Sequence, residues 1–274
     1  MRPLERIEWL ETRTLLAATL NDGLLLVTGE ADTANVIQAG ISGGDPTKFE
    51  VTLNGTEFDF NTADVEVVQI IGGSQNDSLT LDDSTSIRHF IRGLGGNDTI
   101  VGGGGRSNLR GDTGDDVITA NGTRNFIFGN DGNDLITGES SGRNYVVAGD
   151  GADTVTGGDR RDVIFGNGAA DSLAGGNGAD LIFGGRGNDT ILGGDGDDAL
   201  LGGEGNDSIT GGDGNDKLWG MAGADTLAGG NGEDRLFGGP GVDLIDGGRG
   251  TNVVREGEAP NIAAVVDEVN SATI

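Results

Sequence analysis

The residues of this chain that could do chemistry are aspartates that recur at the sixth place of a nine-residue unit. Eighteen such units run from Gly93 to Arg255 on the pattern G-G-x-G-x-D-x-U-x, where U is aliphatic. Carboxylates stacked one per turn would repel one another, and a hard cation with oxygen ligands turns that repulsion into attraction. The spacing therefore indicates rows of cation sites.

A sequence that repeats every nine residues requires structural elements that repeat with the same period. Such a short fixed period is typical of a solenoid. The eighth position shows that the repeat is structural, because it is aliphatic in every unit. This regularity argues against the disorder that high net charge and few aromatic residues would otherwise suggest. The residues are Ile100, Leu109, Ile118, Ile127, Ile136, Val146, Val155, Ile164, Leu173, Ile182, Ile191, Leu200, Ile209, Leu218, Leu227, Leu236, Ile245 and Val254.

The unit resembles the RTX, or hemolysin-type, calcium-binding nonapeptide repeat. The resemblance implies an all-β fold, a parallel β-roll in which GGxGxD forms a turn, xUx forms a short strand and two units make one coil of 18 residues. It also implies that several Ca²⁺ ions lie between successive turns, held by sixth-position carboxylates and glycine-turn carbonyls. The implied ligands are Asp98, Asp116, Asp134, Asp153, Asp171, Asp189, Asp207, Asp225, Asp243, Asp162, Asp180, Asp198, Asp216 and Asp234, with Gly176, Gly178, Gly185, Gly187, Gly194, Gly196, Gly203, Gly205, Gly212 and Gly214.

The aliphatic core of such a roll is too small to hold the fold alone. Each coil would bury two aliphatic side chains, worth about 1.5–3 kcal/mol each. Ordering the residues of one coil costs about 1–2 kcal/mol per residue. We therefore expect folding to depend on calcium.

Alternate units place their turns on opposite edges of the roll, and the two edges differ. The first edge carries aspartate at the sixth position in all nine turns, from Asp98 to Asp243. The second edge begins without aspartate, and its sixth positions read His89, Ser107, Asn125, Asn144, Asp162, Asp180, Asp198, Asp216, Asp234 and Asn252.

Arginine occupies the fifth position in the first four coils of the second edge, which lack aspartate, and in the first coil that carries it, before Asp162. The column comprises Arg88, Arg106, Arg124, Arg143 and Arg161. Our preferred hypothesis is that these guanidinium groups replace calcium and contact turn carbonyls or a carboxylate such as Asp112, Glu139 or Asp159. The alternative is a decayed edge whose arginines lie in solvent.

The ninth position of the same sheet is mostly large and apolar. It reads Phe128, Val147, Phe165, Phe183, Leu201, Trp219 and Phe237. Because neighbouring residues of a strand face opposite sides, this row should face outward. It either seals the strands within one chain or forms a contact face for a partner.

We divide the chain into four parts: a leader or capping segment (1–19), a β-rich N-terminal head that caps the roll (20–83), the roll (84–255) and a C-terminal cap or tail (256–274). In the head, alternating apolar residues predict strands at 24–29, 35–40, 49–55, 58–61 and 65–73. The segment LETRTLL (10–16) resembles the LEPR-x-LL element near the N-terminus of long repetitive planctomycete exported proteins, where its presumed role is sorting. A short amphipathic capping helix is the alternative.

Composition narrows the partner classes. The 274 residues include 45 acidic and 17 basic side chains, a net charge of -28, which argues against nucleic acid and anionic membranes as partners. The chain has no Cys and a single His, His89, which argues against disulfides and against a histidine-based catalytic or zinc site. No apolar stretch approaches the roughly 20 residues of a transmembrane helix.

These observations favour an extracellular, calcium-loaded, non-catalytic structural or adhesive module, associated with a protein or polysaccharide surface. The alternative is a lyase or epimerase that acts on polysaccharide from a β-solenoid. That enzyme would need carboxylates outside the sixth-position rows, and the candidates Asp82, Asp83, Asp115 and Glu139 show no convergent pattern. The hydrolase motifs HExxH and GxSxG are absent from the sequence.

Overall fold

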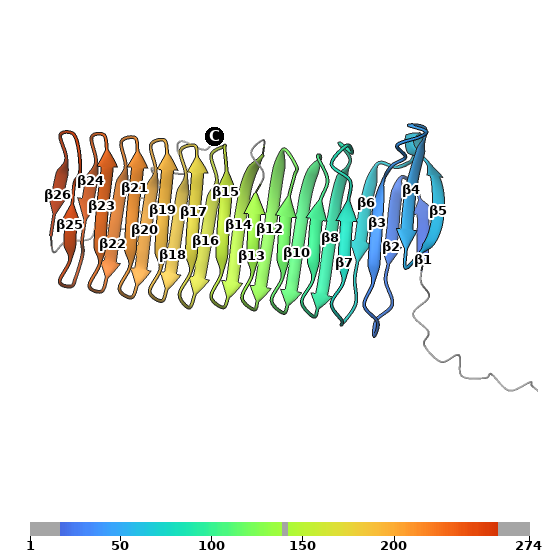
Figure 1. Ribbon diagram of the computed structural model, residues 1–274, viewed down its shortest axis with the longest axis horizontal. Helices are drawn as coiled ribbons and strands as arrows, with labels where there is room; N and C mark the ends of the chain where they lie inside the picture. The colour runs from blue at the N-terminus through green and yellow to red at the C-terminus, as the bar shows by residue number, and fades with distance from the viewer. Residues whose placement is uncertain (1–16, 139–141, 257–274) are drawn as a thin grey trace, which may run out of the picture.

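A computed structural model of the protein describes residues 17–138 and 142–256. Its coils follow one another along the long axis of a rod (Figure 1). Two sheets of 13 strands each form the rod. The described residues contain one 3-10 turn, Thr62–Asp64, and no α-helix. The predicted all-β parallel roll is thereby confirmed.

The two sheets are here called sheet A and sheet B. Sheet A contains, in spatial order, β1 (Ala17–Asn21), β2 (Leu24–Thr28), β6 (Val67–Ile71), β8 (Arg88–Gly95), β10 (Arg106–Thr113), β12 (Arg124–Asp131), β14 (Arg143–Asp150), β16 (Val163–Gly168), β18 (Leu181–Arg186), β20 (Ala199–Glu204), β22 (Lys217–Ala222), β24 (Arg235–Phe237) and β26 (Val253–Arg255). Sheet B contains β5 (Thr56–Asn61), β4 (Lys48–Leu53), β3 (Val36–Ile41), β7 (Ser78–Leu81), β9 (Thr99–Gly102), β11 (Val117–Ala120), β13 (Leu135–Gly138), β15 (Thr154–Gly158), β17 (Ser172–Asn177), β19 (Thr190–Asp195), β21 (Ser208–Asp213), β23 (Thr226–Asn231) and β25 (Leu244–Asp246).

Successive strands of one sheet are parallel and one coil apart in sequence. Ile191 of β19 pairs with Ile209 of β21, a step of 18 residues. The step from Arg124 to Arg143 is 19 residues, because unit 138–147 carries an extra residue before its arginine. This register stacks like residues along the rod and so builds the rows that the sequence predicts.

The aliphatic eighth positions fill the slot between the sheets. Sixteen of them, from Ile100 to Leu236, are at most 1% exposed. The last two behave differently: Ile245 is half-buried and Val254 is 45% exposed. We expected all of them to point into a closed slot. The difference arises at the last coil, where no further described strand stacks beyond β25 and β26.

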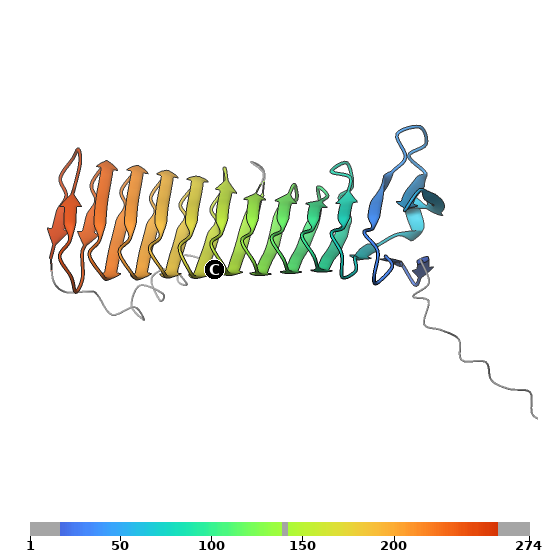
Figure 2. The same cartoon turned by 60° about the horizontal axis from the view of Figure 1, so that its bottom comes forward.

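The N-terminal head continues both sheets. Strand β2 is parallel to β6 and β3 is parallel to β7, so the coils begin inside the head. Beyond them the pairing turns antiparallel, with β1 against β2 and with β4 between β3 and β5 (Figures 1 and 2). Strands β2 to β6 include one for each range predicted in the head. The leader prediction lies outside the described residues except for 17–19, in β1, and the predicted C-terminal cap lies outside them except for Glu256.

The outward ninth-position row packs within the chain over the C-terminal half of sheet A. Phe165 and Phe183 stack with ring centroids 4.9 Å apart, and Trp219 and Phe237 stack at 6.0 Å. Leu201 and Trp219 are each only 4% exposed and belong to a second apolar cluster. In this half, the interpretation of a sealed row is the better one.

Candidate metal centres along the two edges

The sixth-position aspartates of the first edge form a continuous hydrogen-bonded ladder. The Oδ1 atom of each accepts the backbone N–H of the aspartate one coil earlier. Asp98 donates to Asp116 at 2.7 Å, for example, and Asp189 donates to Asp207 at 2.9 Å. The ladder extends into the head, where Asp77 donates to Asp98 and its Oδ1 accepts the backbone N–H of Asn35. The strand register therefore fixes every carboxylate in the same orientation.

The second carboxylate oxygen, Oδ2, is buried and has no hydrogen-bond partner among the described residues in thirteen of the fourteen predicted aspartates; only Asp243 differs. An unpaired buried charge is strongly unfavourable, and such groups in native proteins are paired or bind metals. These atoms are Oδ2 of Asp98, Asp116, Asp134, Asp153, Asp162, Asp171, Asp180, Asp189, Asp198, Asp207, Asp216, Asp225 and Asp234.

In twelve of these thirteen turns, the unpaired Oδ2 and a backbone carbonyl oxygen of the next coil lie close to the same first-position glycine. An ideal Cβ on Gly193, the first residue of its unit, would lie 2.3 Å from Asp198 Oδ2 and 2.6 Å from the carbonyl oxygen of Gly211, one coil later. Gly166 has the same surroundings on the first edge. Two oxygens thus converge beside a glycine that leaves space, and a hard cation with oxygen ligands fits this donor set. One turn departs from the pattern, because Ala148 takes the first position in the unit of Asp153.

Burial raises the pKa of twelve of these carboxyl groups. The pKa rises to about 7 for Asp98 and Asp116 and to about 8 for Asp198. Desolvation is the main cause, the backbone hydrogen bond at Oδ1 opposes it, and neighbouring aspartates add to it. Without a cation, such groups would hold protons close to neutral pH.

The first half of the second edge is held by neutral side chains. Asn144 Nδ2 donates to the carbonyl of Gly157 at 2.8 Å, and Asn125 Nδ2 donates to Asn144 Oδ1 at 2.7 Å. Two coils before Asn125, the Nε2 of His89 accepts the N–H of Gly103 at 3.1 Å, and burial lowers the pKa of His89. At the Asn144 turn, a side-chain amide N–H therefore bonds to the first-position carbonyl that lies near an unpaired Oδ2 in the aspartate turns. The asparagines at the sixth position could have predicted these hydrogen bonds from the sequence, since an asparagine side chain carries both an acceptor and a donor.

The preferred hypothesis for the arginine column is wrong for three of its five members. Arg106, Arg124 and Arg143 are exposed, and no described residue forms a hydrogen bond or ion pair with them. The proposed carboxylate partners bind elsewhere or are not described: Asp112 pairs with Arg92, Asp159 accepts a hydrogen bond from Asn177, and Glu139 lies outside the described residues. Asn144 and Asn125 form their own hydrogen bonds in these turns without a guanidinium group. Arg88 instead lies over the ring of Phe90.

The predicted glycine ligands lie at the second and fourth positions of the turns. All ten have positive φ. Their turns stack so closely that a Cβ on Gly196 would lie 1.5 Å from the carbonyl oxygen of Gly178. A side chain there would be both strained and in collision. The carbonyl that the structure brings to Oδ2 is that of the first-position glycine, which the sequence reasoning missed.

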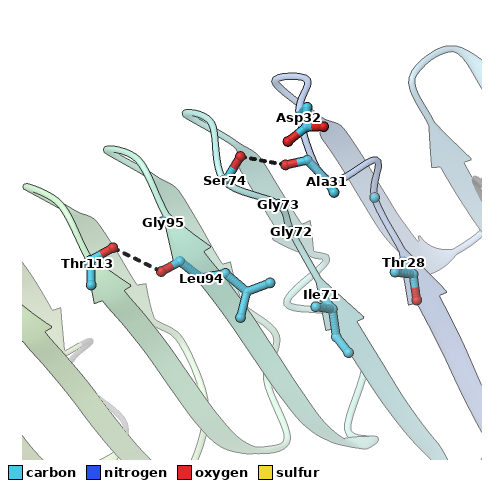
Figure 3. A pocket seen from close by; sticks show the side chains of 11 residues that line it. Thr28, Ala31, Asp32, Ile71, Gly72, Gly73, Ser74, Leu94, Gly95 and Thr113 are labelled. Carbon is cyan, nitrogen blue, oxygen red and sulfur yellow. Dashed lines mark hydrogen bonds between the residues drawn. The ribbon is translucent and has the colours of Figure 1, made fainter. Parts of the chain in front are cut away.

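Two hollows that the described residues of the head form do not gather a set of catalytic groups. One of about 450 Å³ is lined by turns at the start of the first edge, where Ser74 Oγ donates to the Ala31 carbonyl (Figure 3). Asp32 is its only carboxylate. A second, of about 330 Å³, holds Glu50 and Asp82, and the hydrogen bonds from Ser84 lower the pKa of Asp82. A lowered pKa does not suit a general acid at neutral pH.

The other carboxylates considered for a polysaccharide-acting enzyme do not add a catalytic group to these two hollows. Asp83 lines neither hollow, Asp115 accepts hydrogen bonds from Asn133, and Glu139 lies outside the described residues. Among the described residues, no three carboxylate or imidazole groups meet at one point. A cation on either edge would therefore combine carboxylates with backbone carbonyls.

The profile of the RTX calcium-binding nonapeptide repeat matches the chain over residues 90–254, in the stretches 90–109, 110–141, 139–173, 156–191, 192–227 and 219–254. The chain belongs to this family. It is a calcium-binding RTX β-roll protein, and its repeats bind multiple Ca²⁺ ions. Among curated proteins, none matches the chain significantly. In the part of the RTX chain that the structure describes, no helix has the length and hydrophobicity needed to cross a bilayer.

Proposed function

We propose that this RTX protein is an exported structural or adhesive module without catalytic activity, folded by the calcium that it binds. The observation that carries the proposal is the set of thirteen buried Oδ2 atoms without a hydrogen-bond partner. Their environment disfavours the charged carboxylate, so each needs either a proton or a cation. Calcium satisfies this need at neutral pH.

The proposed ligands are the sixth-position aspartates of both edges and the first-position carbonyls that converge with them. On the second edge these turns run from Asp162 to Asp234, while the Ser107, Asn125 and Asn144 turns bind no ion. Bound calcium would supply the positive charge that lets like-charged turns stack. Because an unfolded chain does not hold these ligands together, the binding free energy becomes folding free energy.

Two arguments support export and a non-catalytic role. Calcium sites in extracellular modules have dissociation constants of about 10⁻⁴–10⁻³ M, against about 10⁻⁷–10⁻⁵ M for cytosolic sensors. A roll with sites of the weaker kind would fold only outside the cell. The candidate sites also repeat along the rod instead of converging at one centre, which suits a scaffold or a binding surface.

Circular dichroism tests the proposal. The calcium-free protein in EGTA should lack most of its β signal, and millimolar Ca²⁺ should restore the signal and raise the melting temperature. An unchanged spectrum and melting temperature would contradict it, and a dissociation constant below about 10⁻⁶ M would remove the argument for export. Release of oligosaccharides from polysaccharide by the calcium-loaded protein would favour the enzymatic alternative.

A further inference from the structure

The N-terminal half of sheet A carries a surface that we call the arginine–aromatic face. Arginines stand at one end of four consecutive strands, and two positions further along the outward residues are mostly aromatic. The strand register places like positions side by side. The face comprises Arg88, Arg106, Arg124 and Arg143 in one column and Phe90, Asn108, Phe126 and Tyr145 in the next, on β8, β10, β12 and β14.

This face is open to solvent, unlike the apolar cluster further along the sheet. Phe126 is 37% exposed and Tyr145 is 38% exposed, whereas Trp219 is 4% exposed. The rings form a row, with centroids 6.0 Å apart between Phe126 and Tyr145 and 5.6 Å apart between Tyr145 and Phe165. Aromatic residues and arginine are the side chains enriched where proteins bind partners. Their joint exposure indicates a binding surface.

The row of rings is interrupted where the face begins. Asn108 pairs in register with Phe90 on one side and Phe126 on the other, and its side chain is shorter than either ring. A hollow of about 220 Å³ opens there, lined by Arg88 and Arg106 as well as by the two phenylalanines. The hollow therefore has apolar walls beside two guanidinium groups.

The arginine column suits an anionic ligand with closely spaced charges. Its members repeat with the strand spacing of about 4.8 Å, and Arg106, Arg124 and Arg143 have no hydrogen-bond or ion-pair partner among the described residues. Guanidinium groups bind carboxylate and sulfate through paired hydrogen bonds. The chain as a whole has a charge of -28, but charges further away than a Debye length of about 8 Å at physiological ionic strength are largely screened. The guanidinium groups of the column therefore contribute the closely spaced positive charges at this face.

We propose that the arginine–aromatic face binds a linear acidic polysaccharide whose carboxylate or sulfate groups pair with the arginine column. The rings of Phe126 and Tyr145 would pack against the apolar faces of the sugars. Their planes are tilted by 42° to each other, which offers a platform but no slot for a nucleic-acid base between them. The inference rests on the proposed role as an adhesive module and names its partner class.

Binding to three forms of one polymer tests the inference at saturating calcium. Dextran sulfate, carboxymethyl-dextran and neutral dextran share a backbone and differ in charge. The calcium-loaded protein should bind one or both charged polymers, and the preferred one identifies sulfate or carboxylate as the recognised group. Equal binding to neutral dextran, tighter binding to DNA, or no binding to either charged polymer would overturn the inference.

Matched variants localise the binding. The triple variant Arg106→Gln, Arg124→Gln, Arg143→Gln should weaken binding at least tenfold, a loss of about 1.4 kcal/mol. The control Arg186→Gln, Arg235→Gln, Arg249→Gln removes the same charge elsewhere and should change affinity less than about twofold, below 0.5 kcal/mol. Phe126→Ala with Tyr145→Ala should also weaken binding. Equal losses in the two arginine triples would show non-specific attraction and contradict the inference.

Calcium-induced circular dichroism of each variant separates this inference from the proposed function. Normal folding in calcium with no polymer binding would overturn the inference alone. Loss of the calcium response in the unaltered protein would instead overturn the proposed function.

Discussion

Asn144 Nδ2 donates a hydrogen bond to the carbonyl oxygen of Gly157 at 2.8 Å. One coil later, Asp162 presents Oδ2 in the corresponding place, and that oxygen has no hydrogen-bond partner among the described residues. Adjacent coils of one edge thus stabilise the first-position carbonyl in two different ways. A neutral amide satisfies the carbonyl directly, and a carboxylate requires a cation between the two oxygens.

Asn144→Asp should convert an amide turn into a calcium-dependent turn. Without calcium, the lost donor and the new buried charge should destabilise the protein by about 1–3 kcal/mol. With calcium, the loss should largely disappear and the stoichiometry should rise. Denaturant unfolding with and without calcium, together with calorimetric titration, measures both effects. Asn206→Asp is the control, because Asn206 is exposed and uses its side-chain oxygen as an acceptor; an equal response there would show that any added charge suffices.

Asp198→Asn should have the opposite effect. Calcium stoichiometry should fall, because an oxygen ligand becomes an amide. The calcium-free protein should become more stable at pH 7, because an asparagine is buried without taking up a proton. Asn125→Ala should leave stoichiometry unchanged but cost about 1–3 kcal/mol, since Asn125 bonds to Gly122 and Asn144. Titration calorimetry of both variants checks this. A reduced stoichiometry in Asn125→Ala would place calcium where we propose none.

Acid should partly replace calcium. Burial raises the pKa of Asp98, Asp116 and Asp153 from 3.8 to about 7 in the folded chain. Between these values the folded state binds more protons than the unfolded state, so the stability of the calcium-free protein falls as pH rises through this window. Its β signal should therefore grow on acidification from pH 7 toward 4.5, and calcium affinity should weaken. High salt at pH 7 screens surface repulsion without protonating these groups. If salt restored the signal as well as acid does, surface charge would be the cause.

Arg124→Lys should leave the free energy of unfolding within about 0.5 kcal/mol of that of the unaltered protein. The side chain is exposed, and no described residue bonds to it, so loss of the planar fork removes no contact within the chain. Thermal melts at saturating calcium measure the difference. A clear destabilisation would restore the hypothesis that this guanidinium holds the edge in place of calcium.

The period of the sequence was enough to predict the roll, because stacking coils in register brings like residues such as Ile191 and Ile209 together. It also separated the two edges by their sixth positions. The direction of Arg124 could not be predicted, because a long exposed side chain is not fixed by backbone register. The convergence of the Gly211 carbonyl with Asp198 Oδ2 depends on turn geometry, and the pattern G-G-x-G-x-D alone does not say which carbonyl faces the carboxylate.

Anomalous scattering from crystals grown in calcium tests the central claim most directly, because it locates each ion. The account predicts density beside the Oδ2 atoms of the first-edge aspartates and of the second edge from Asp162 to Asp234. It predicts none between the turns of Ser107, Asn125 and Asn144. Ions at those three turns, or aspartate rows without ions, would contradict it.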